Sequence, residues 1–243
     1  MRSTKPIIGV TLSARSAWRI FPLMWLGLRL AGARAVKWVD ADAVDIDAVD
    51  GVIIGGGDDI SPELYGGEMV VTARLDPARD ALERAVLRDA FARDLPVLGI
   101  CRGAQMLNIV AGGSLDQDAY GTHQTRNVKT ILPRKTVRIA DGTRLGGLAG
   151  TGDMRVNALH SQAVDRVGIG LRVAARDSTG MIQAVERVRA PFALGVQWHP
   201  EHLFYMRRHR ALFRGLVSAA RARSENTGQM ASVDAEIAGM AVD

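Results

Sequence analysis

Short apolar runs alternate with amphipathic segments along the first half of the chain. The runs are rich in Val, Ile and Leu, as expected of buried strands, and the segments between them carry apolar residues at helical spacing. The predicted strands cover residues 7–12, 35–39, 50–54 and 96–100, and the predicted helices cover residues 18–31, 76–93 and 103–111. Strands that alternate with helices in this order predict an α/β domain with a mostly parallel sheet.

The second half has a different pattern, in which short β-branched or alternating segments are separated by turn residues. The predicted strands cover residues 135–139, 170–174, 181–186 and 192–196, and a final helix covers residues 203–222. Such segments are more typical of antiparallel strands added to a sheet. We therefore expect one domain over residues 1–222. The tail at 223–243 has little periodicity, and we expect it to be loosely ordered.

Composition limits the class of protein. A chain of 243 residues with 47% hydrophobic residues can bury a substantial core. A single cysteine excludes an intrachain disulfide framework, and the absence of a cysteine cluster argues against a structural zinc site. The apolar segment Arg19–Arg29 resembles the core of a signal peptide, but it follows a strand-like run and falls short of the roughly 20 residues that span a bilayer. We expect a cytoplasmic protein with no membrane partner.

The net charge of +5 raises the question of an anionic partner. The basic residues are scattered among acidic ones, and aromatic residues make up only 5% of the chain, so no basic groove with stacking rings is indicated. The one basic cluster, Met206–Arg214, fits the solvated face of a helix. We expect no nucleic-acid partner.

The stretch VLGICRGAQ, from Val97 to Gln105, is the first candidate for chemistry. A buried strand ends at Cys101, and a helix begins at once after it, which is the arrangement of a nucleophile elbow. The N-terminus of that helix would favour the thiolate form of Cys101. A free cysteine can equally be a small buried hydrophobic residue, and the local sequence leaves both interpretations open.

The stretch GVQWHPE, from Gly195 to Glu201, offers the partners that a nucleophilic cysteine requires. His199 can act as the base, and Glu201 can orient it from the same side of an extended chain. The two stretches together predict a triad of Cys101, His199 and Glu201.

Two other constellations compete with this triad. His199 and His202, with His209 beyond, could suggest a metal site, but Pro200 would interrupt a helix that placed them on one face. Ser161 stands beside His160 with Asp165 nearby, yet adjacent residues do not face each other productively. We expect neither a metal ion nor a serine triad.

The third motif is VIIGGGD, from Val52 to Asp58, where a strand ends in three glycines. Its backbone N–H groups could form an oxyanion hole together with the N–H of Arg102, the residue after the nucleophile. A dinucleotide fingerprint would require a further glycine pattern that opens a helix, and the sequence continues with DDISP instead.

Together these motifs resemble one family of the class I glutamine amidotransferase superfamily, the γ-glutamyl-γ-aminobutyrate hydrolases, which are peptidase C26-like. The resemblance covers residues 5–216, nearly the whole domain. It rests on five ordered motifs: GGGDDISPELYG (55–66), DPARDALE (76–83), GICRGAQ (99–105), NALHSQ (157–162) and GVQWHPE (195–201).

The resemblance implies a flavodoxin-like, three-layer α/β/α domain and a hydrolase that needs no cofactor. Such an enzyme cleaves a small γ-glutamyl amide through a thioester and releases glutamate, for example in polyamine and putrescine catabolism. It also implies the following roles: Cys101 as nucleophile, His199 as base, Glu201 as its orienting partner, Gly56, Gly57 and Arg102 as oxyanion donors, and Gln105, His160 and Ser161 as contacts to the glutamyl group.

Two departures from the family pattern leave the substrate open. Ser161 stands where the family commonly has a second histidine, and Gln183 stands where it has an acidic residue. Neither touches the triad, so we expect activity with an undetermined leaving amine. Two alternatives remain: a glutaminase subunit that delivers ammonia to a separate synthetase, and a non-catalytic binding protein on the same fold. The oligomeric state is open, with a homodimer as one option.

Overall fold

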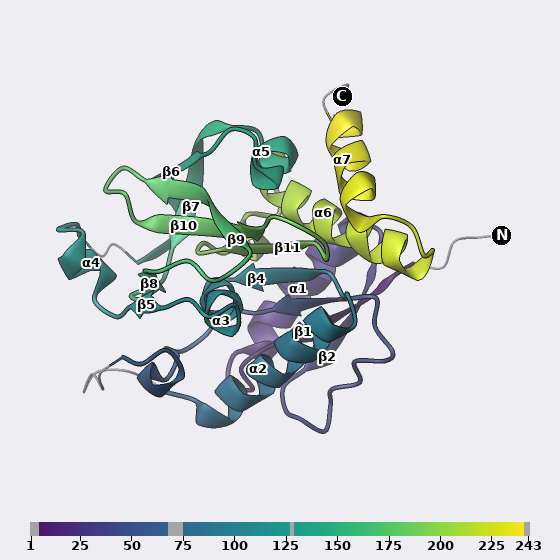
Figure 1. The fold of residues 1–243 in the computed structure, drawn as a ribbon, viewed down its shortest axis with the longest axis horizontal. Coiled ribbons are helices and arrows are strands. Elements are labelled where there is room, and N and C mark those ends of the chain that lie inside the picture. Colours follow the sequence, from purple (N-terminus) through teal and green to yellow (C-terminus); the bar gives the residue numbers. More distant parts are fainter. Residues whose placement is uncertain (1–4, 68–74, 127–128, 241–243) are drawn as a thin grey trace.

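A computed structural model describes residues 5–67, 75–126 and 129–240. Its main feature is a nine-stranded sheet in the order β2-β1-β3-β4-β11-β10-β9-β6-β7 (Figure 1). The bounds of these strands are β1 Ile7–Thr11, β2 Arg34–Trp38, β3 Gly51–Ile54, β4 Val97–Ile100, β6 Thr130–Ile139, β7 Gly152–Ala158, β9 Leu171–Asp177, β10 Ile182–Arg187 and β11 Ala193–Val196. Strands β2, β1, β3, β4 and β11 are mutually parallel, and β10, β9, β6 and β7 continue the sheet in antiparallel pairs.

Helices cover both faces of this sheet. Their bounds are α1 Ala17–Leu30, α2 Pro77–Ala92, α3 Arg102–Val110, α4 Ala119–Thr122, α5 Arg144–Ala149, α6 Arg207–Ser224 and α7 Gln229–Met240, with 3₁₀ turns η1 Pro62–Leu64 and η2 Pro200–Leu203. A separate two-stranded ladder joins β5 Leu115–Asp116 to β8 Ala163–Val164. None of the described helices is both long and apolar enough to cross a membrane.

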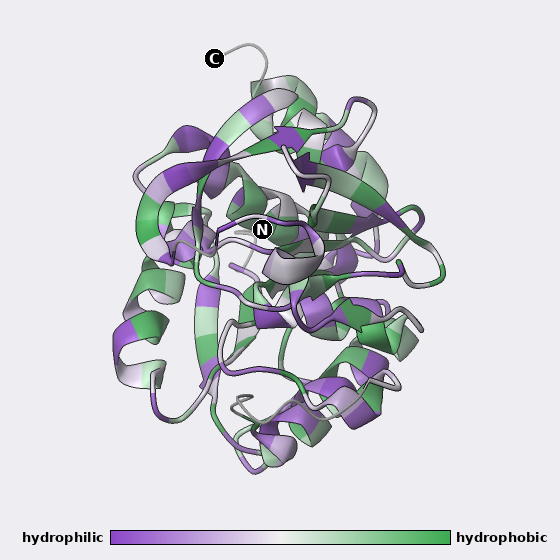
Figure 2. Ribbon diagram, turned by 90° about the vertical axis from the view of Figure 1, so that its left-hand side faces the viewer, coloured by the Kyte–Doolittle hydropathy of each residue, from purple (hydrophilic) through white to green (hydrophobic). Residues whose placement is uncertain are grey.

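The core lies in two layers because successive residues of a strand point to opposite faces. Ile53 of β3 packs in the cluster with α1 and α6, whereas its neighbours Val52 and Ile54 pack with α2 and α3. Green and purple alternate along the outer helices in Figure 2, as expected of helices with one face on the core. The predicted α/β fold, with parallel core strands and added antiparallel strands, is confirmed.

The first half agrees closely with the sequence prediction, since each predicted strand and helix is present with its ends displaced by at most one residue. The second half differs more. Strand β7 was not predicted, although its buried Met154, Val156 and Ala158 alternate along the chain. Strand β6 begins at Thr130, earlier than expected.

The structure also differs from the expectation of a loosely ordered tail. Residues Gln229–Met240 form helix α7, which packs against α6. The side chain of Gln229 accepts from the N–H of Phe192 at 3.0 Å and donates to the carbonyl of Asp94 at 2.6 Å. Val233 is fully buried, and Met230 and Ile237 pack on the core beside it. These residues are three and four positions apart, as on one face of a helix, but they are too few to give the tail a clear helical periodicity.

Candidate active site

The carboxyl ends of three adjacent parallel strands position the candidate catalytic groups. Strand β4 lies between β3 and β11, so the segments that follow these three strands meet at one edge of the sheet. The glycine loop 55–57 follows β3, Cys101 follows β4, and His199 comes shortly after β11. Ligands of open α/β sheets collect at this edge.

Cys101 occupies a strained elbow between β4 and α3. Its φ of 52° and ψ of −107° lie in a region that few residues other than glycine adopt. Two glycines make the turn feasible: a Cβ on Gly103 would lie 1.9 Å from the carbonyl oxygen of Ile54, and a Cβ on Gly99 would lie 2.6 Å from that of Gly103. This close packing holds the thiol at the rim of a cleft of about 550 Å³.

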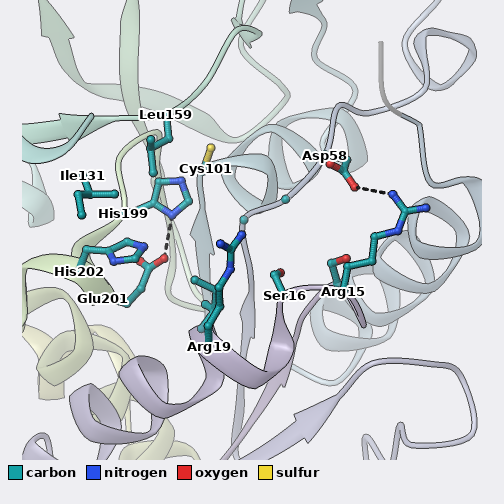
Figure 3. Close-up of a pocket in the computed structure, with 14 residues that line it drawn as sticks. Arg15, Ser16, Arg19, Asp58, Cys101, Ile131, Leu159, His199, Glu201 and His202 are labelled. Carbon is teal, nitrogen blue, oxygen red and sulfur yellow. Dashed lines mark hydrogen bonds and ion pairs between the residues drawn. The ribbon is translucent and has the colours of Figure 1, made fainter. Parts of the chain in front are cut away.

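His199 is held in the orientation that a general base requires. Its Nδ1 lies 2.8 Å from Oε1 of Glu201, which leaves Nε2 free to face Cys101, and both side chains line the same cleft (Figure 3). The backbone is fixed as well, because the N–H of His199 donates to Oδ1 of Asn157 at 2.8 Å and Nδ2 of Asn157 donates to the carbonyl of His199 at 3.1 Å.

The electrostatics of this cluster favour a protonated imidazole. Burial alone lowers the pKa of His199, but the charges of Glu201 and Cys101 and the hydrogen bond to Glu201 raise it well above its ordinary value. An imidazolium beside a thiolate is the resting state of a cysteine nucleophile with a histidine partner. The structure thus brings together all three residues of the predicted triad.

The glycine loop lies directly against the triad. A Cβ on Gly56 would be 2.6 Å from Cε1 of His199 and 3.5 Å from Cβ of Cys101, so only glycine fits. Gly56 and Gly57 line the cleft, and Arg102 opens helix α3, whose first N–H groups have no partner within the helix. The N–H groups of these three residues donate to no residue that the structure describes.

The remaining walls of the cleft differ in character. Ile131 and Leu159 form an apolar side, whereas Arg15 and Arg19, at the beginning of α1, form a cationic side (Figure 3). Arg15 lies 3.9 Å from Asp58. Arg19 forms no ion pair with any described residue, and its side chain extends towards the glycine loop and Cys101. The cleft can therefore attract an anionic group opposite the thiol.

The three predicted glutamyl contacts do not line this cleft; Gln105 and His160 are buried, and Ser161 is half-buried. Nε2 of Gln105 donates to the carbonyl of Gln162 at 2.7 Å and to Oε1 of Gln197 at 3.2 Å. Burial lowers the pKa of His160 to about 3, so its ring is neutral. The hydroxyl of Ser161 donates to Asp59 at 3.2 Å. Their contact with a substrate stays a prediction.

Several residues of the site were missed by sequence reasoning. Asn157 stands in a motif that was recognised, but only the structure shows that it binds the backbone of His199. Nε2 of Gln197 lies 3.6 Å from Sγ of Cys101. The buried charges of Arg79, Asp80, Glu83 and Arg102 form one network under the glycine loop. The motif DPARDALE, which contains three of these charged residues, was the available signal.

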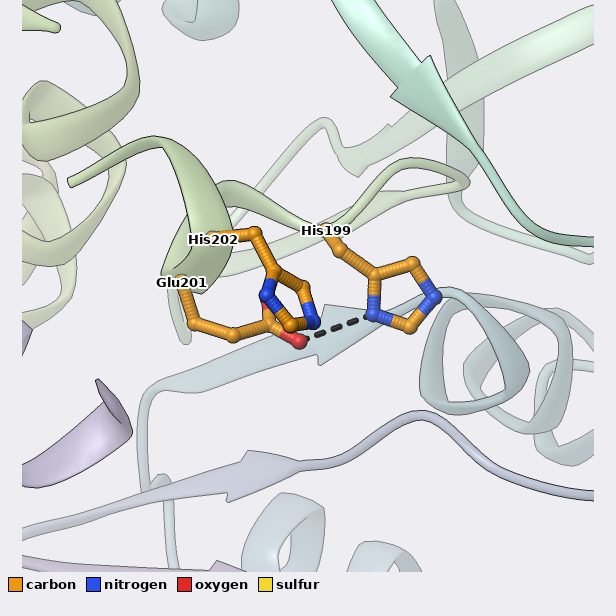
Figure 4. Close-up of side chains that lie close together, drawn as sticks. All are labelled: His199, Glu201 and His202. Carbon is orange, nitrogen blue, oxygen red and sulfur yellow. Dashed lines mark hydrogen bonds and ion pairs between the residues drawn. The ribbon is translucent and has the colours of Figure 1, made fainter. Parts of the chain in front are cut away.

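The residues of the alternative metal site lie closer to one another than we expected from the position of Pro200. Pro200 begins the 3₁₀ turn η2, and ligand atoms of His199, Glu201 and His202 lie within 4.8 Å of one another (Figure 4). However, Nδ1 of His199 is already engaged by Glu201, so a metal ion would have to displace that hydrogen bond. His209 points elsewhere, with Nε2 at 3.1 Å from the carbonyl of Arg155.

The alternative serine triad is not assembled among the described residues. The hydroxyl of Ser161 is bonded to Asp59, and Nδ1 of His160 lies 3.2 Å from the carbonyl of Gln162. Asp165 instead accepts from the hydroxyl of Ser114 at 2.9 Å. The three side chains therefore serve separate contacts.

Comparison with known proteins identifies the family of the chain. The family model for peptidase C26 matches residues 37–201, a range that includes the whole triad. A protein of Mycobacterium tuberculosis, provisionally named a glutamine amidotransferase, is 39% identical over 238 residues, covering 90% of this chain and 76% of its own length. The γ-glutamyl-γ-aminobutyrate hydrolase PuuD of Escherichia coli is 35% identical over 183 residues, covering 70% of this chain and 72% of its own.

A solved structure supports the same fold. The crystal structure of a provisionally assigned GMP synthase subunit from Thermoplasma acidophilum matches with a TM-score of 0.68 at 20% identity, over 92% of this chain and 97% of that one. This likeness concerns the fold alone. The family model and the two relatives carry the assignment: the chain belongs to the peptidase C26 family of class I glutamine amidotransferase-like hydrolases.

Proposed function

We propose that the protein hydrolyses the γ-glutamyl amide bond of γ-glutamyl-γ-aminobutyrate or of a related amide whose leaving amine carries a carboxylate. The observation that carries this proposal is the cleft itself, which Cys101 and the hydrogen-bonded pair of His199 and Glu201 line together with Arg19. The E. coli relative is named as a hydrolase of this substrate, which supports the choice.

The proposed reaction proceeds by acyl transfer to the thiol. The thiolate of Cys101 attacks the γ-carbonyl carbon, and backbone N–H groups of Gly56, Gly57 and Arg102 donate hydrogen bonds to the developing oxyanion. The C–N bond then breaks as Nε2 of His199 gives its proton to the leaving amine, which leaves a γ-glutamyl thioester. His199 next takes a proton from water, the hydroxide attacks the thioester, and glutamate is released with the thiolate restored.

The cationic side of the cleft supports an acidic leaving group. γ-Aminobutyrate ends in a carboxylate, which can pair with the guanidinium of Arg19. A polyamine leaving group would instead bring an ammonium towards two arginines, and like charges at short range are unfavourable. Because Arg19 is exposed, its ion pair with a substrate should contribute only about 1 kcal/mol.

A second candidate is a glutaminase subunit that delivers ammonia to a separate synthetase. The M. tuberculosis relative, provisionally named a glutamine amidotransferase, favours it. In that case glutamine would be the preferred substrate, and the isolated chain would turn it over slowly.

The test is glutamate release by the purified protein from γ-glutamyl-γ-aminobutyrate, γ-glutamylputrescine and glutamine, with Cys101→Ala as background. We expect the highest kcat/KM for γ-glutamyl-γ-aminobutyrate. Arg19→Gln should lower that value about fivefold without changing turnover of glutamine. Arg15→Gln is the matched control, since Arg15 already lies near Asp58.

Each outcome selects a different conclusion. Preference for γ-glutamylputrescine would reject the acidic leaving group while keeping the hydrolase. Turnover of glutamine alone would favour the glutaminase subunit. No Cys101-dependent release from any of the three would reject both enzymatic proposals and favour the binding protein.

A further inference from the structure

The buried charge network beneath the glycine loop takes no direct part in the proposed acyl transfer. It consists of two arginines and two carboxylates, all nearly inaccessible to solvent: Arg79, Asp80, Glu83 and Arg102. Burial lowers the pKa of Arg79 and that of Arg102 to about 10, so both remain charged at neutral pH. A buried arginine needs several hydrogen-bond acceptors, and the acceptors of Arg79 indicate its role.

Arg79 divides its guanidinium between a carboxylate and the glycine loop. Its Nε donates to Oε1 of Glu83 at 2.8 Å, and its Nη2 donates to the carbonyls of Gly55 at 3.1 Å and Gly56 at 2.9 Å. One rigid side chain therefore fixes two successive peptide planes of the loop.

The direction of these bonds determines where the loop N–H groups point. In a trans peptide unit the C=O and the N–H point to opposite sides. The carbonyl of Gly55 shares its unit with the N–H of Gly56, and the carbonyl of Gly56 shares its unit with the N–H of Gly57. Because Arg79 binds both carbonyls, both N–H groups are turned away from it. Gly56 and Gly57 line the cleft together with Cys101, so the cleft is where these N–H groups can meet a substrate.

The loop is shaped around this arginine. A Cβ on Gly57 would lie 1.9 Å from Nη1 of Arg79, so a side chain there and the guanidinium could not coexist. The absence of a side chain at Gly57 thus allows Arg79 to approach the loop, and the absence of one at Gly56 allows His199 to approach it.

The same network reaches the nucleophile elbow. Oε1 of Glu83 accepts from Arg79 and from the hydroxyl of Thr11, while Oε2 accepts from the side chain of Arg102, which also binds Asp80. Arg102 directly follows Cys101 and supplies the third candidate oxyanion donor. Glu83 therefore binds both Arg79, which holds the glycine loop, and the side chain of Arg102, whose N–H is the third candidate donor.

We propose that Arg79 is a positioning residue that sets the oxyanion hole by holding the carbonyls of Gly55 and Gly56. This rests on the acyl-transfer chemistry proposed above but not on the identity of its substrate. Loss of the guanidinium of Arg79 should slow the steps in which an oxyanion develops. Reactions of the thiolate that form no oxyanion should keep their rates.

Two reagents separate these effects on the intact protein. p-Nitrophenyl acetate acylates Cys101 through a tetrahedral oxyanion, whereas iodoacetamide alkylates it by direct displacement without one. Rates are measured for wild type and Arg79→Lys, with the Cys101→Ala rate subtracted, and unfolding temperatures are recorded. Lysine keeps the charge but cannot hold two carbonyls and Glu83 together.

Arg208→Lys is the matched control. Arg208 also binds backbone carbonyls, at 2.8 Å for Gly150 and 2.7 Å for Asp153 in β7, but it does not line the catalytic cleft. Any general effect of replacing a carbonyl-binding arginine should therefore appear in both variants.

We expect Arg79→Lys to lower the acylation rate at least about tenfold, approaching the roughly 10²–10³ typical for loss of an oxyanion donor, while alkylation changes less than about threefold. With a γ-glutamyl amide that is turned over, kcat should fall and KM should stay constant. Equal losses in acylation and alkylation, or no loss in either, would overturn the proposal. Because neither reagent carries a glutamyl group, this result is independent of whether the proposed substrate is hydrolysed.

Discussion

The parallel and antiparallel parts of the sheet contribute different residues to the candidate active site. The parallel strands β3, β4 and β11 end in short segments that carry the glycine loop, Cys101 and His199. The antiparallel part contributes Ile131 of β6 and Leu159 after β7 as walls of the cleft, and Asn157 of β7 as a brace for His199. The reacting groups thus belong to the parallel part, and the antiparallel part supplies the apolar wall of the cleft and a support for His199.

This difference between the two parts shows which site residues can be recognised from the local sequence pattern. Parallel strands are buried on both faces, so they appear as uninterrupted apolar runs, and a polar residue after such a run lies at the ligand-binding edge. The antiparallel strands are partly exposed, and the position of their side chains depends on register and bulges. Substitutions in the two parts should therefore differ in size and kind.

The largest expected effect comes from the nucleophile itself. Cys101→Ala should lower the rate of γ-glutamyl amide hydrolysis at least about 10⁴-fold, because no other group can form the thioester. Steady-state glutamate release measures the loss. An unchanged unfolding temperature would show that the fold is intact, and activity above a tenth of wild type would show that chemistry lies elsewhere.

Glu201→Gln should have the next largest effect, lowering kcat about 10³-fold. Glutamine cannot stabilise the imidazolium, and the loss of the Glu201 charge should bring the pKa of His199 down from its raised value. NMR titration of the His199 ring measures that shift directly. A His199 pKa unchanged in the variant would contradict the assigned role of Glu201.

Asn157→Ala tests the contribution of the antiparallel part. Losing both hydrogen bonds to the backbone of His199 should lower kcat about tenfold by loosening the base. It should also cost about 2 kcal/mol of stability, because the backbone groups stay buried.

Asn108→Ala serves as its control. Asn108 is equally buried and also bonds loop backbone, accepting from Gly168 at 2.8 Å and donating to Ser114 at 3.1 Å. We expect a similar loss of stability with kcat within about twofold of wild type. Equal losses of kcat in both variants would mean that Asn157 acts through general stability alone.

The sequence predicted the reacting groups better than it predicted their support. Cys101, His199 and Glu201 follow apolar runs at strand ends, so the two stretches that contain them were sufficient, taken together, to predict the triad. Asn157, Arg79 and Glu83 act across long separations in the chain, such as the 42 residues between Asn157 and His199. No local pattern encodes such pairs, since they depend on how the sheet and helices pack.

Helix α7 illustrates a different reason for failure. Its apolar positions are few, and Gln229 gains its role only from the carbonyl of Asp94 and the N–H of Phe192, distant in sequence. A short helix with a weak apolar face is stabilised by such tertiary contacts rather than by its own propensity. The pattern of the tail therefore understated its order.

The smallest expected effect lies at the seam between the two parts, where α6 packs against β7. His209 of α6 is fully buried, and its Nε2 lies 3.1 Å from the carbonyl of Arg155 in β7. Burial lowers its pKa to about 4, whereas an unfolded histidine titrates near about 6.5. Between these values the unfolded chain binds the proton and the folded chain does not, so His209 should reduce stability as the pH falls.

The corresponding variant is His209→Gln, which keeps an N–H donor for Arg155 and cannot titrate. Chemical denaturation should give similar stability for both proteins at about pH 7.5, apart from a constant packing cost. At about pH 5 wild type should lose about 2 kcal/mol more than the variant. An identical pH dependence in both proteins would show that the seam stays accessible to protons, and that the two parts are joined less tightly than the buried contact indicates.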